Sequence, residues 1–415
     1  MKKILVITLA VALSFVGSFF MTKDAQAVPG FARQTGHACT TCHFQSFPSL
    51  NSFGRAFKAG GYTQIGDQGK IEDEGLSIPN VLNMSLIVKA RYSQTNGDSK
   101  AGRDRGQIEI PDEAALMAGG RGGEHVGFLL ERGLKTAGGF DSFKIIFPFD
   151  MGGTTLAAGA FTTDALGAAY GFEVLNTGAL RLQKPFGEGV ATSAQQYTGL
   201  NTYAATGIVL YGASDMFFVN ASLWGPSHSD TISSGLNLGQ YIRAAVTPNL
   251  GGWDTAIGVQ YWGGETKLGE ATSATYVVQG TAIDAQAQGE IGGMPLGVYL
   301  TYATVPKAGT DGKTYAIAAS EADKSATSIA ANLGIIPNKA TIGLSYLMGK
   351  NGMNDKPAEN AMNIAATYKL AQNVKLQLDY ATFSGDADVK TVAQSGGDMG
   401  SMYSNRTTLM LFSVF

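Results

Sequence analysis

Cysteine and charged residues are scarce in this chain of 415 residues. The only two cysteines are Cys39 and Cys42, and charged residues make up 15% of the sequence, against about 25% in a typical soluble domain. The formal net charge is −3. The chain therefore has no basic excess, and we expect no nucleic-acid partner.

Long apolar runs are also missing beyond the N-terminal region. No run of about 18 or more apolar residues follows Phe20, which argues against a helical membrane protein. The chain is instead rich in glycine, with 55 residues, and 10% of its residues are aromatic. This composition favours a β-rich protein, either soluble or in an outer membrane.

The first 27 residues have the pattern of a secretory signal peptide. Lys2 and Lys3 form a positive start, residues 4–20 are apolar, and Ala25-Gln26-Ala27 fits a small-residue cleavage site. An uncleaved membrane anchor is the alternative. We expect residues 1–27 to be a signal peptide and Val28 to begin the mature chain.

Both cysteines belong to the run Cys39-Thr40-Thr41-Cys42-His43. A Cys-x-x-Cys-His sequence is the attachment motif of a c-type haem. The two thiols form thioethers with the haem vinyl groups, and the histidine is an axial ligand of the iron. We therefore predict one covalent c-type haem, with Cys39 and Cys42 as its anchors and His43 as the proximal ligand of the haem iron.

Two other roles of a Cys-x-x-Cys pair are open at this point. A redox disulfide of the thioredoxin type would need a βαβ context, and the sequence shows none. A zinc site would need a second pair of ligands, and the chain has no further cysteine.

Residues 28–79 are predicted to form a small α-helical haem module and a linker. Basic residues of the module are candidates for pairing with the haem propionates, and they are Arg33, Arg55 and Lys58. Apolar residues at helix-like spacing precede Gly60-Gly61, which would end the helix, and they are Phe44, Phe47, Leu50, Phe53 and Phe57. Residues 62–79 are polar and acidic and are interpreted as the linker.

From Asn80 onward, apolar residues alternate with mostly polar ones, which is the two-residue period of β-strands. The clearest runs are 82–92, 253–261, 296–302 and 374–380. Strands of about 9–12 residues cross a bilayer when tilted. We predict that residues 80–415 form a porin-like domain, an all-β transmembrane antiparallel β-barrel of about 16 strands in contact with outer-membrane lipid.

The connections between these runs alternate in length. Short turns are expected at 213–215, 247–249, 336–338 and 371–373, and long polar loops near 96–125, 226–237, 264–274, 306–323, 350–359 and 385–402. This alternation is typical of outer-membrane barrels. The strand pattern is weakest between 151 and 203, where residues 165–176 are alternatively an inward loop or helix. An even strand number would leave both barrel ends on the periplasmic side.

The end of the chain supports the outer membrane of a Gram-negative bacterium as its location. The last run ends in Phe415, and a final strand with a C-terminal aromatic resembles outer-membrane barrels generally. A soluble β-sandwich or propeller is the alternative. Against it, the faces opposite the apolar ones are polar and glycine-rich but carry too little charge for an ordinary solvent surface.

The N-terminal module resembles a known family. The resemblance is carried by Pro29-Gly30-Phe31-Ala32-Arg33-Gln34-Thr35-Gly36, the Cys39–His43 motif, Phe47-Pro48, Leu50 and Phe53-Gly54-Arg55-Ala56-Phe57-Lys58. These segments are similar to the fused monohaem cytochrome–porins of the outer membrane, which are known as iron oxidases of Fe(II)-oxidising bacteria. Over the barrel, the resemblance is one of length, strand pattern and C-terminus.

The resemblance implies a single haem within the barrel or at its mouth. It also implies extracellular Fe(II) as the electron donor and a periplasmic carrier, such as a soluble cytochrome, as the acceptor. The chain would then be an iron oxidase of the Fe(II):cytochrome c oxidoreductase type. The alternatives are a haem-bearing electron conduit for a different extracellular donor or acceptor, and a solute porin with a structural haem plug.

The distal haem ligand and the iron-binding residues stay open. Met117 and His125 are candidate distal ligands, whereas His37 is too close to Cys39 in the chain to reach the opposite haem face, and His228 lies in an expected loop. Carboxylates suit a hard cation, and the expected first loop contains Asp104, Glu109, Asp112, Glu113 and Glu124. Inward-facing charged residues are expected to line the lumen, among them Lys89, Arg91, Lys375 and Asp379.

Overall fold

The computed structural model describes residues 30–66, 68–74, 76–96, 106–135, 140–178, 193–201, 204–228, 237–267, 275–309, 320–355, 357–386 and 403–415. The expected signal peptide, residues 1–27, lies outside these ranges. Within them, no helix is both long enough and apolar enough to cross a membrane.

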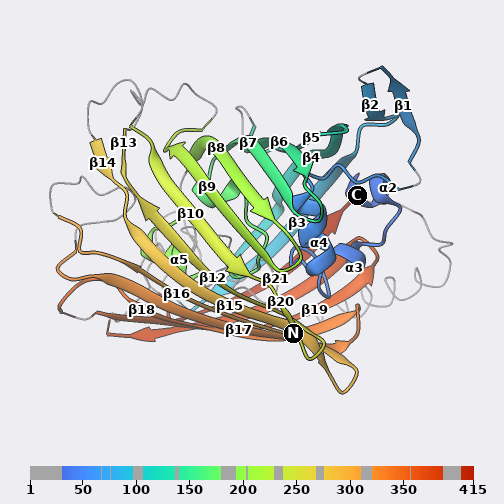
Figure 1. Ribbon diagram of the computed structural model, residues 1–415. Helices are drawn as coiled ribbons and strands as arrows, with labels where there is room; N and C mark the ends of the chain where they lie inside the picture. Colours follow the sequence, from blue (N-terminus) through green and yellow to red (C-terminus); the bar gives the residue numbers. More distant parts are fainter. Residues whose placement is uncertain are drawn as a thin grey trace, which may run out of the picture.

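An antiparallel sheet that closes on itself forms most of the molecule (Figure 1). In the described part, sixteen strands of eight or more residues make up the ring, and β21 pairs with β3 to complete it. At this seam Arg406 lies opposite Thr95, and Val414 lies opposite Ile87. The predicted fold class and the expected strand number are confirmed.

The strands are separated by turns and loops of very different length. The sixteen are β3 Met84–Thr95, β4 Gly106–Gly123, β5 Val126–Gly133, β6 Ser142–Asp150, β7 Thr155–Thr163, β8 Ala205–Ala213, β9 Phe217–Gly225, β10 Gly239–Val246, β12 Trp253–Gly263, β15 Gly280–Ile291, β16 Met294–Val305, β17 Lys324–Ile336, β18 Ala340–Lys350, β19 Ala358–Ala371, β20 Val374–Gly385 and β21 Asn405–Val414. The described parts of the connections contain three short strands, namely β11 Asn249–Leu250, β13 Glu265–Lys267 and β14 Thr275–Val277.

The alternation in sequence matches the two faces of the barrel wall. On β12, Ile257 is 65% exposed and Val259 is 53% exposed on the outside, while Ala256 and Gln260 are buried on the inside. Large apolar side chains are exposed in the same way on neighbouring strands, for example Ile208, Leu210, Ile242, Ile283, Ile329, Leu344, Ile364 and Leu378. The barrel therefore has an apolar outer surface and a more polar interior, the pattern of transmembrane barrels.

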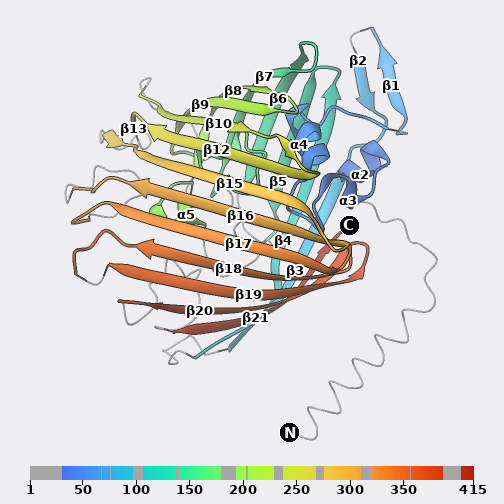
Figure 2. The same cartoon turned by 60° about the horizontal axis from the view of Figure 1, so that its bottom comes forward.

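The two ends of the barrel differ, as the connections predict. One end has turns of a few residues at 124–125, 151–154, 214–216, 247–252, 292–293, 337–339 and 372–373, and in Figure 2 the turns between β15 and β20 at this end lie near the C-terminus. We call this the short-turn end. The other end has the longer connections, and β3 begins where β21 ends, at the short-turn end.

The connection between β7 and β8 enters the barrel. Its described residues include the 3₁₀ turn η1 Ala168–Tyr170 and the helix α5 Ala194–Thr198. Ala169, Phe172 and Thr177 are fully buried in it. We call its described residues, 164–178 and 193–201, the inward loop. The alternative offered for residues 165–176 is therefore confirmed, and the loop explains why the strand pattern fails there.

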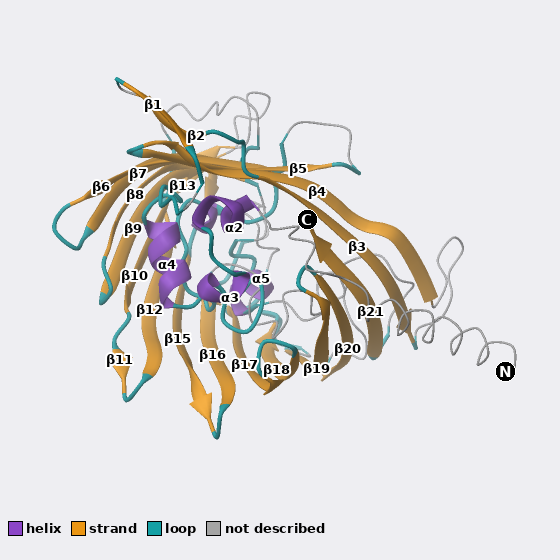
Figure 3. Ribbon diagram, turned by 90° about the vertical axis from the view of Figure 1, so that its right-hand side faces the viewer, coloured by secondary structure: helices purple, strands orange, loops and turns teal. Residues whose placement is uncertain are grey.

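The N-terminal module lies within the ring of strands at the short-turn end. Figure 3 looks into this end and shows the helices α2 Gly30–Thr35, α3 Cys39–Cys42 and α4 Ser52–Ala59 surrounded by strands. Phe57 and Tyr62 of the module belong to the same buried cluster as Phe172 of the inward loop and Tyr211 of β8. The hydrophobic core of this protein thus fills part of the barrel lumen.

Two local predictions were wrong, and the expected linker contains an unexpected hairpin. The helix expected from Phe44 begins only after Asn51, which caps it by accepting the Gly54 N–H, because Pro48 cannot lie in a helix interior. The expected linker contains the hairpin β1 Lys70–Asp73 and β2 Leu76–Pro79. The first loop is not residues 96–125, because strand β4 already begins at Gly106.

Candidate haem site

The Cys-x-x-Cys-His motif forms one helical turn and the residue that ends it. Helix α3 consists of Cys39–Cys42 alone, and His43 leaves it in an extended conformation while its N–H donates to the Cys39 carbonyl at 2.9 Å. Residues three apart lie on the same side of a helix. Both thiols are free, so they are available on one side of this turn.

The imidazole of His43 is held by its neighbours. Its Nδ1 lies 3.3 Å from the Ser49 carbonyl oxygen, and the ring of Phe47 packs against it edge-on at 5.4 Å. Burial lowers the pKa of His43 to about 4, so the ring is neutral, which is the form that binds a metal. A hydrogen bond from Nδ1 to a backbone carbonyl leaves Nε2 as the ligating nitrogen.

A glycine gives the motif its close packing against helix α4. A Cβ atom on Gly54 would lie 2.1 Å from the Cys42 carbonyl oxygen. Only glycine therefore allows α4 to approach Cys42 so closely. Gly54 is part of the segment that carries the family resemblance, and this contact gives a physical reason for a glycine there.

A largely apolar cavity of about 390 Å³ opens beside the motif. Its walls come from three parts of the chain. The module contributes Cys39, Cys42, His43, Phe31, Leu50 and Phe57, the barrel contributes Ile87, Met117, Leu129 and Phe412, and the inward loop contributes Leu166, Tyr170, Val174 and Leu175. Cofactor pockets typically measure about 300–1,000 Å³ and are mainly apolar. The donor set and the cavity therefore fit a c-type haem.

The structure separates the candidate distal ligands. Met117 and His37 both line the cavity. His125 lies in the β4–β5 turn, stacks on Phe149 at 5.7 Å, and is not among the described residues that line the cavity. His228 is bonded to Thr162 at 3.2 Å, near the loop end of β9. Met117 is thus the predicted distal candidate that shares a cavity with His43.

Of the three basic residues predicted to meet the propionates, the structure places only Lys58 at the cavity. The Arg33 guanidinium donates to the Met84 carbonyl. Arg55 forms a two-bond ion pair with Asp254 of β12, with both N–O distances at 2.7 Å. These two arginines fix the module to the barrel wall instead.

The acidic residues expected in the first loop do not form one site. Glu113 pairs with Lys89, and Asp112 pairs with Arg91 at 2.6 Å, in both cases between β3 and β4. Glu124 lies in the short β4–β5 turn. Asp104 falls outside the described residues. In the described part, no three His, Cys, Asp or Glu side chains are grouped as metal ligands.

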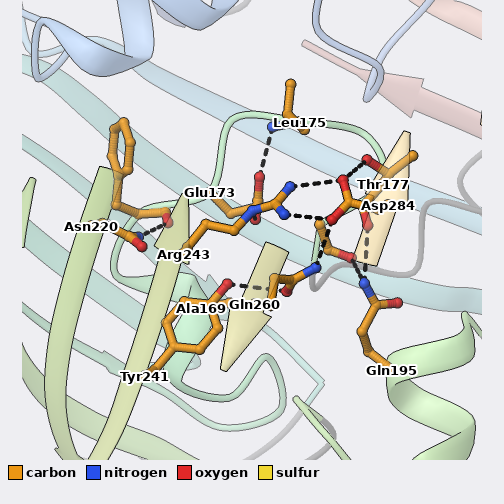
Figure 4. A network of polar contacts seen from close by, with 12 residues as sticks. Ala169, Glu173, Leu175, Thr177, Gln195, Asn220, Tyr241, Arg243, Gln260 and Asp284 are labelled. Carbon is orange, nitrogen blue, oxygen red and sulfur yellow. Dashed lines mark hydrogen bonds and ion pairs between the residues drawn. The ribbon is translucent and has the colours of Figure 1, made fainter. Parts of the chain in front are cut away.

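A buried ionic network fastens the inward loop to the barrel wall (Figure 4). Arg243 of β10 donates through Nε to Glu173 of the loop at 3.0 Å and through its other nitrogens to Asp284 of β15. Asp284 also accepts from Thr177 of the loop. Arg243 is fully buried. A buried charge needs such partners, so this network fixes the loop across the lumen.

Sequence reasoning did not identify Glu173, Arg243 or Asp284. The sequence pattern could have identified two of them. Arg243 and Asp284 each follow an apolar residue that faces outward on the same strand, Ile242 and Ile283, respectively. A charge at such a position faces the lumen. Nothing in the sequence shows that a loop residue will meet it there.

The comparisons with known proteins agree with the architecture. No protein-family model and no curated protein matches the sequence. Among solved structures, the chain is similar to the anion-selective porin from Comamonas acidovorans, with a TM-score of 0.52 and 12% identity over 81% of this chain and 99% of that one. It also matches OmpT of Vibrio cholerae, with a TM-score of 0.47 and 12% identity over 84% of this chain and 100% of that one. At this identity the likeness to the Comamonas porin shows a porin-like β-barrel fold.

Proposed function

We propose that this chain spans the outer membrane of a Gram-negative bacterium and transfers electrons through one covalently attached c-type haem. The electrons would pass from extracellular Fe(II) to a periplasmic carrier such as a soluble cytochrome. The observation that carries the proposal is the position of Cys39, Cys42 and His43 on the wall of a largely apolar cavity within the barrel.

The outer surface supports the membrane location. Apolar side chains are exposed on strand after strand, and such a surface is stable only against lipid or another apolar partner. A closed barrel also leaves no unpaired strand edge in the bilayer. The short-turn end, which holds the module, would face the periplasm, because outer-membrane barrels have short periplasmic turns and longer outer loops.

The physical reason for combining a haem with a barrel is the insulating membrane. The apolar band of an outer-membrane barrel is about 25 Å tall, so an electron that crosses it needs a redox centre inside a protein. A c-type haem would supply a one-electron Fe(III)/Fe(II) centre tuned by its ligands and surroundings. Cys39 and Cys42 would anchor it, His43 would bind the iron, and the inward loop would shield it from the lumen.

Fe(II) as the donor rests on the resemblance to the cytochrome–porins. The described acidic residues form no metal site, so Fe(II) would give up its electron without being bound by a cluster of ligands in that part of the chain. No proton donor or acceptor is required for such a transfer.

Anaerobic stopped-flow absorbance tests this function. The oxidised, membrane-reconstituted protein is mixed with Fe(II), alongside a His43→Ala variant. We expect rapid growth of the reduced c-type haem bands in the wild type and its loss in the variant. A wild-type haem that stays oxidised would exclude Fe(II) as the direct donor and favour a conduit for a different donor or acceptor.

A solute porin with a structural haem plug is the second candidate, and the porin-like barrel favours it. Conductance of small solutes in liposomes tests it directly. A size-dependent flux through the intact protein would support transport. The absence of flux, together with reduction by Fe(II), would leave electron transfer as the function.

A further inference from the structure

We propose that Lys58 and Lys144 form a receptor for two carboxylates in the cavity, and that these are the propionates of the haem. The inference rests on the proposed haem and adds its orientation. The two lysines are positioning residues, because they would act on the peripheral groups of the haem and not on its iron.

Lys58 lies one helical turn beyond the glycine that packs on the motif. Gly54 touches Cys42, and Lys58, four residues later on the same face of α4, is about 6 Å further along the helix axis. Within the described residues, its ammonium has no hydrogen-bond or ion-pair partner. Its surface is only half-buried, yet its surroundings are protein on every side. Its exposed part therefore faces the cavity and not bulk solvent.

Lys144 brings a second ammonium to the same cavity from β6. Only 2% of this residue is exposed. Its Nζ donates to the Tyr170 carbonyl of the inward loop and lies 3.8 Å from the centre of the Tyr170 ring. A lysine ammonium has three donors, so further donors are available. Lys58 and Lys144 thus line the same cavity.

Two acidic side chains, Glu173 and Glu131, also line this cavity. Glu173 accepts from Arg243 at 3.0 Å and from the Leu175 N–H at 2.7 Å. The charged neighbours of Glu131 are Glu113, Asp141, Asp164 and Lys89, and its oxygen lies 3.5 Å from the Ser142 hydroxyl. Neither carboxylate is within hydrogen-bond distance of the two lysines in the described part of the chain.

The missing partner must be anionic and must fit beside apolar walls. Two lysines in one cavity without a directly paired carboxylate are unfavourable, and charge-assisted hydrogen bonds to carboxylates would stabilise them. Haem has an apolar ring with two carboxylates on one edge, and the thioether-forming vinyl groups belong to other edges. Anchored at Cys39 and Cys42, it would direct its carboxylates away from the motif, toward Lys58 and Lys144.

The consequence is a defined orientation of the cofactor. Its carboxylate edge would face Tyr170 and Glu173 of the inward loop, and its thioether edge would face the short-turn end. The inward loop would then influence the potential of the haem through these carboxylates.

Resonance Raman spectroscopy of the propionate bending bands, with redox titration over a range of pH, tests the proposal in the full-length haem protein. The variants are Lys58→Met and Lys144→Met, with Lys58→Arg and Lys144→Arg as charge-conserving partners. The control is Lys375→Met, because Lys375 donates to the Phe47 carbonyl at 3.3 Å and its charge acts on His43, but it is not among the described residues that line the cavity.

We expect each methionine variant to shift the propionate bands and to raise the apparent propionate pKa, read from the potential, by about 1–3 units. Lys375→Met should leave the propionate bands unchanged. If a methionine variant failed to load haem while its arginine partner loaded normally, the requirement for charge would still support the proposal. Wild-type propionate bands in both methionine variants would overturn it without affecting the haem assignment, whereas a wild-type protein without haem would overturn the proposed function itself.

Discussion

The side chain of Asn176 binds both backbone groups of Leu50. Its Oδ1 accepts the Leu50 N–H at 2.9 Å, and its Nδ2 donates to the Leu50 carbonyl at 3.0 Å. Leu50 in turn pairs with His43 as an antiparallel bridge. The inward loop and the segment that holds His43 are therefore one structural unit, although Leu50 and Asn176 lie 126 residues apart.

Replacing Asn176 by leucine should loosen the module within the barrel. The change removes both hydrogen bonds and leaves the Leu50 N–H and carbonyl without their partner, at a cost of about 1–3 kcal/mol. We expect faster proteolysis of residues 30–60 in detergent micelles and a lower yield of attached haem. Asn354→Leu is the control, because Asn354 is exposed in the β18–β19 loop. Equal protection of the module in the two variants would show that the Asn176 contact is unimportant.

Gly54 should be intolerant of any side chain. Alanine would place its Cβ 2.1 Å from the Cys42 carbonyl oxygen, so α4 and α3 would have to separate. We expect Gly54→Ala to lose most covalent haem, measured by haem staining of the denatured protein. Gly60→Ala is the matched control, since its nearest neighbour would be 3.5 Å away and its φ is −72°. Normal haem content in Gly54→Ala would mean that the close packing is dispensable.

The Arg55–Asp254 pair should depend on the fork of the guanidinium. Lysine keeps the charge but cannot make two parallel bonds, and hydrogen bonds to charged groups contribute about 1.5–3 kcal/mol. Arg55→Lys and Asp254→Asn should each destabilise the module. The double variant should be only slightly less stable than the less stable single variant, because either change alone already removes the interaction. A double-mutant cycle of module proteolysis measures this coupling. Strictly additive effects would contradict a direct interaction.

Lys58 should make the haem-free protein more stable at alkaline pH. Burial lowers the pKa of Lys58 from 10.5 to about 8 in the folded state, and the nearby charge of Glu173 opposes this shift only in part. The unfolded state then binds more protons between pH 8 and 10.5, so the free energy of unfolding rises with pH across this range, by up to about 3 kcal/mol. Module proteolysis of a Cys39→Ala/Cys42→Ala protein measures it.

The control for this pH effect is the same protein with Lys58→Met. Its module stability should lack the rise above pH 8 because the titrating group is gone. An identical rise in both proteins would assign the effect to another residue.

The sequence predicted the barrel well because its period of two is a local property. Adjacent residues such as Val88 and Lys89, or Leu378 and Asp379, face opposite sides of a strand, and this can be predicted without knowing which strands pair with it. The prediction of the first loop at 96–125 was wrong because a strand with charged residues facing the lumen has the polar composition of a loop. Glu109, Asp112 and Glu113 lie on β4, and the last two face the cations Arg91 and Lys89 across the strand pair. Pro111 interrupts the alternation there and hides the strand.

The candidate site was predictable in part. The motif identifies Cys39, Cys42 and His43, because their spacing is local and their chemistry specific. The enclosing walls are not local. Lys144 and Glu173 reach the cavity only because the barrel closes and the inward loop folds back. The spacing of residues in the sequence does not show that these two side chains line the same cavity. The same holds for Asp254, the partner of Arg55.

Intact-protein mass spectrometry tests the central claim most directly. The protein is produced in cells with an active cytochrome c maturation system, and its absorbance is recorded in alkaline pyridine. We predict a mass increase corresponding to one covalently attached haem and a c-type haem spectrum, both lost in a Cys39→Ala/Cys42→Ala variant that still forms the barrel. A wild-type protein with the mass of the unmodified mature chain and no haem spectrum would contradict the account.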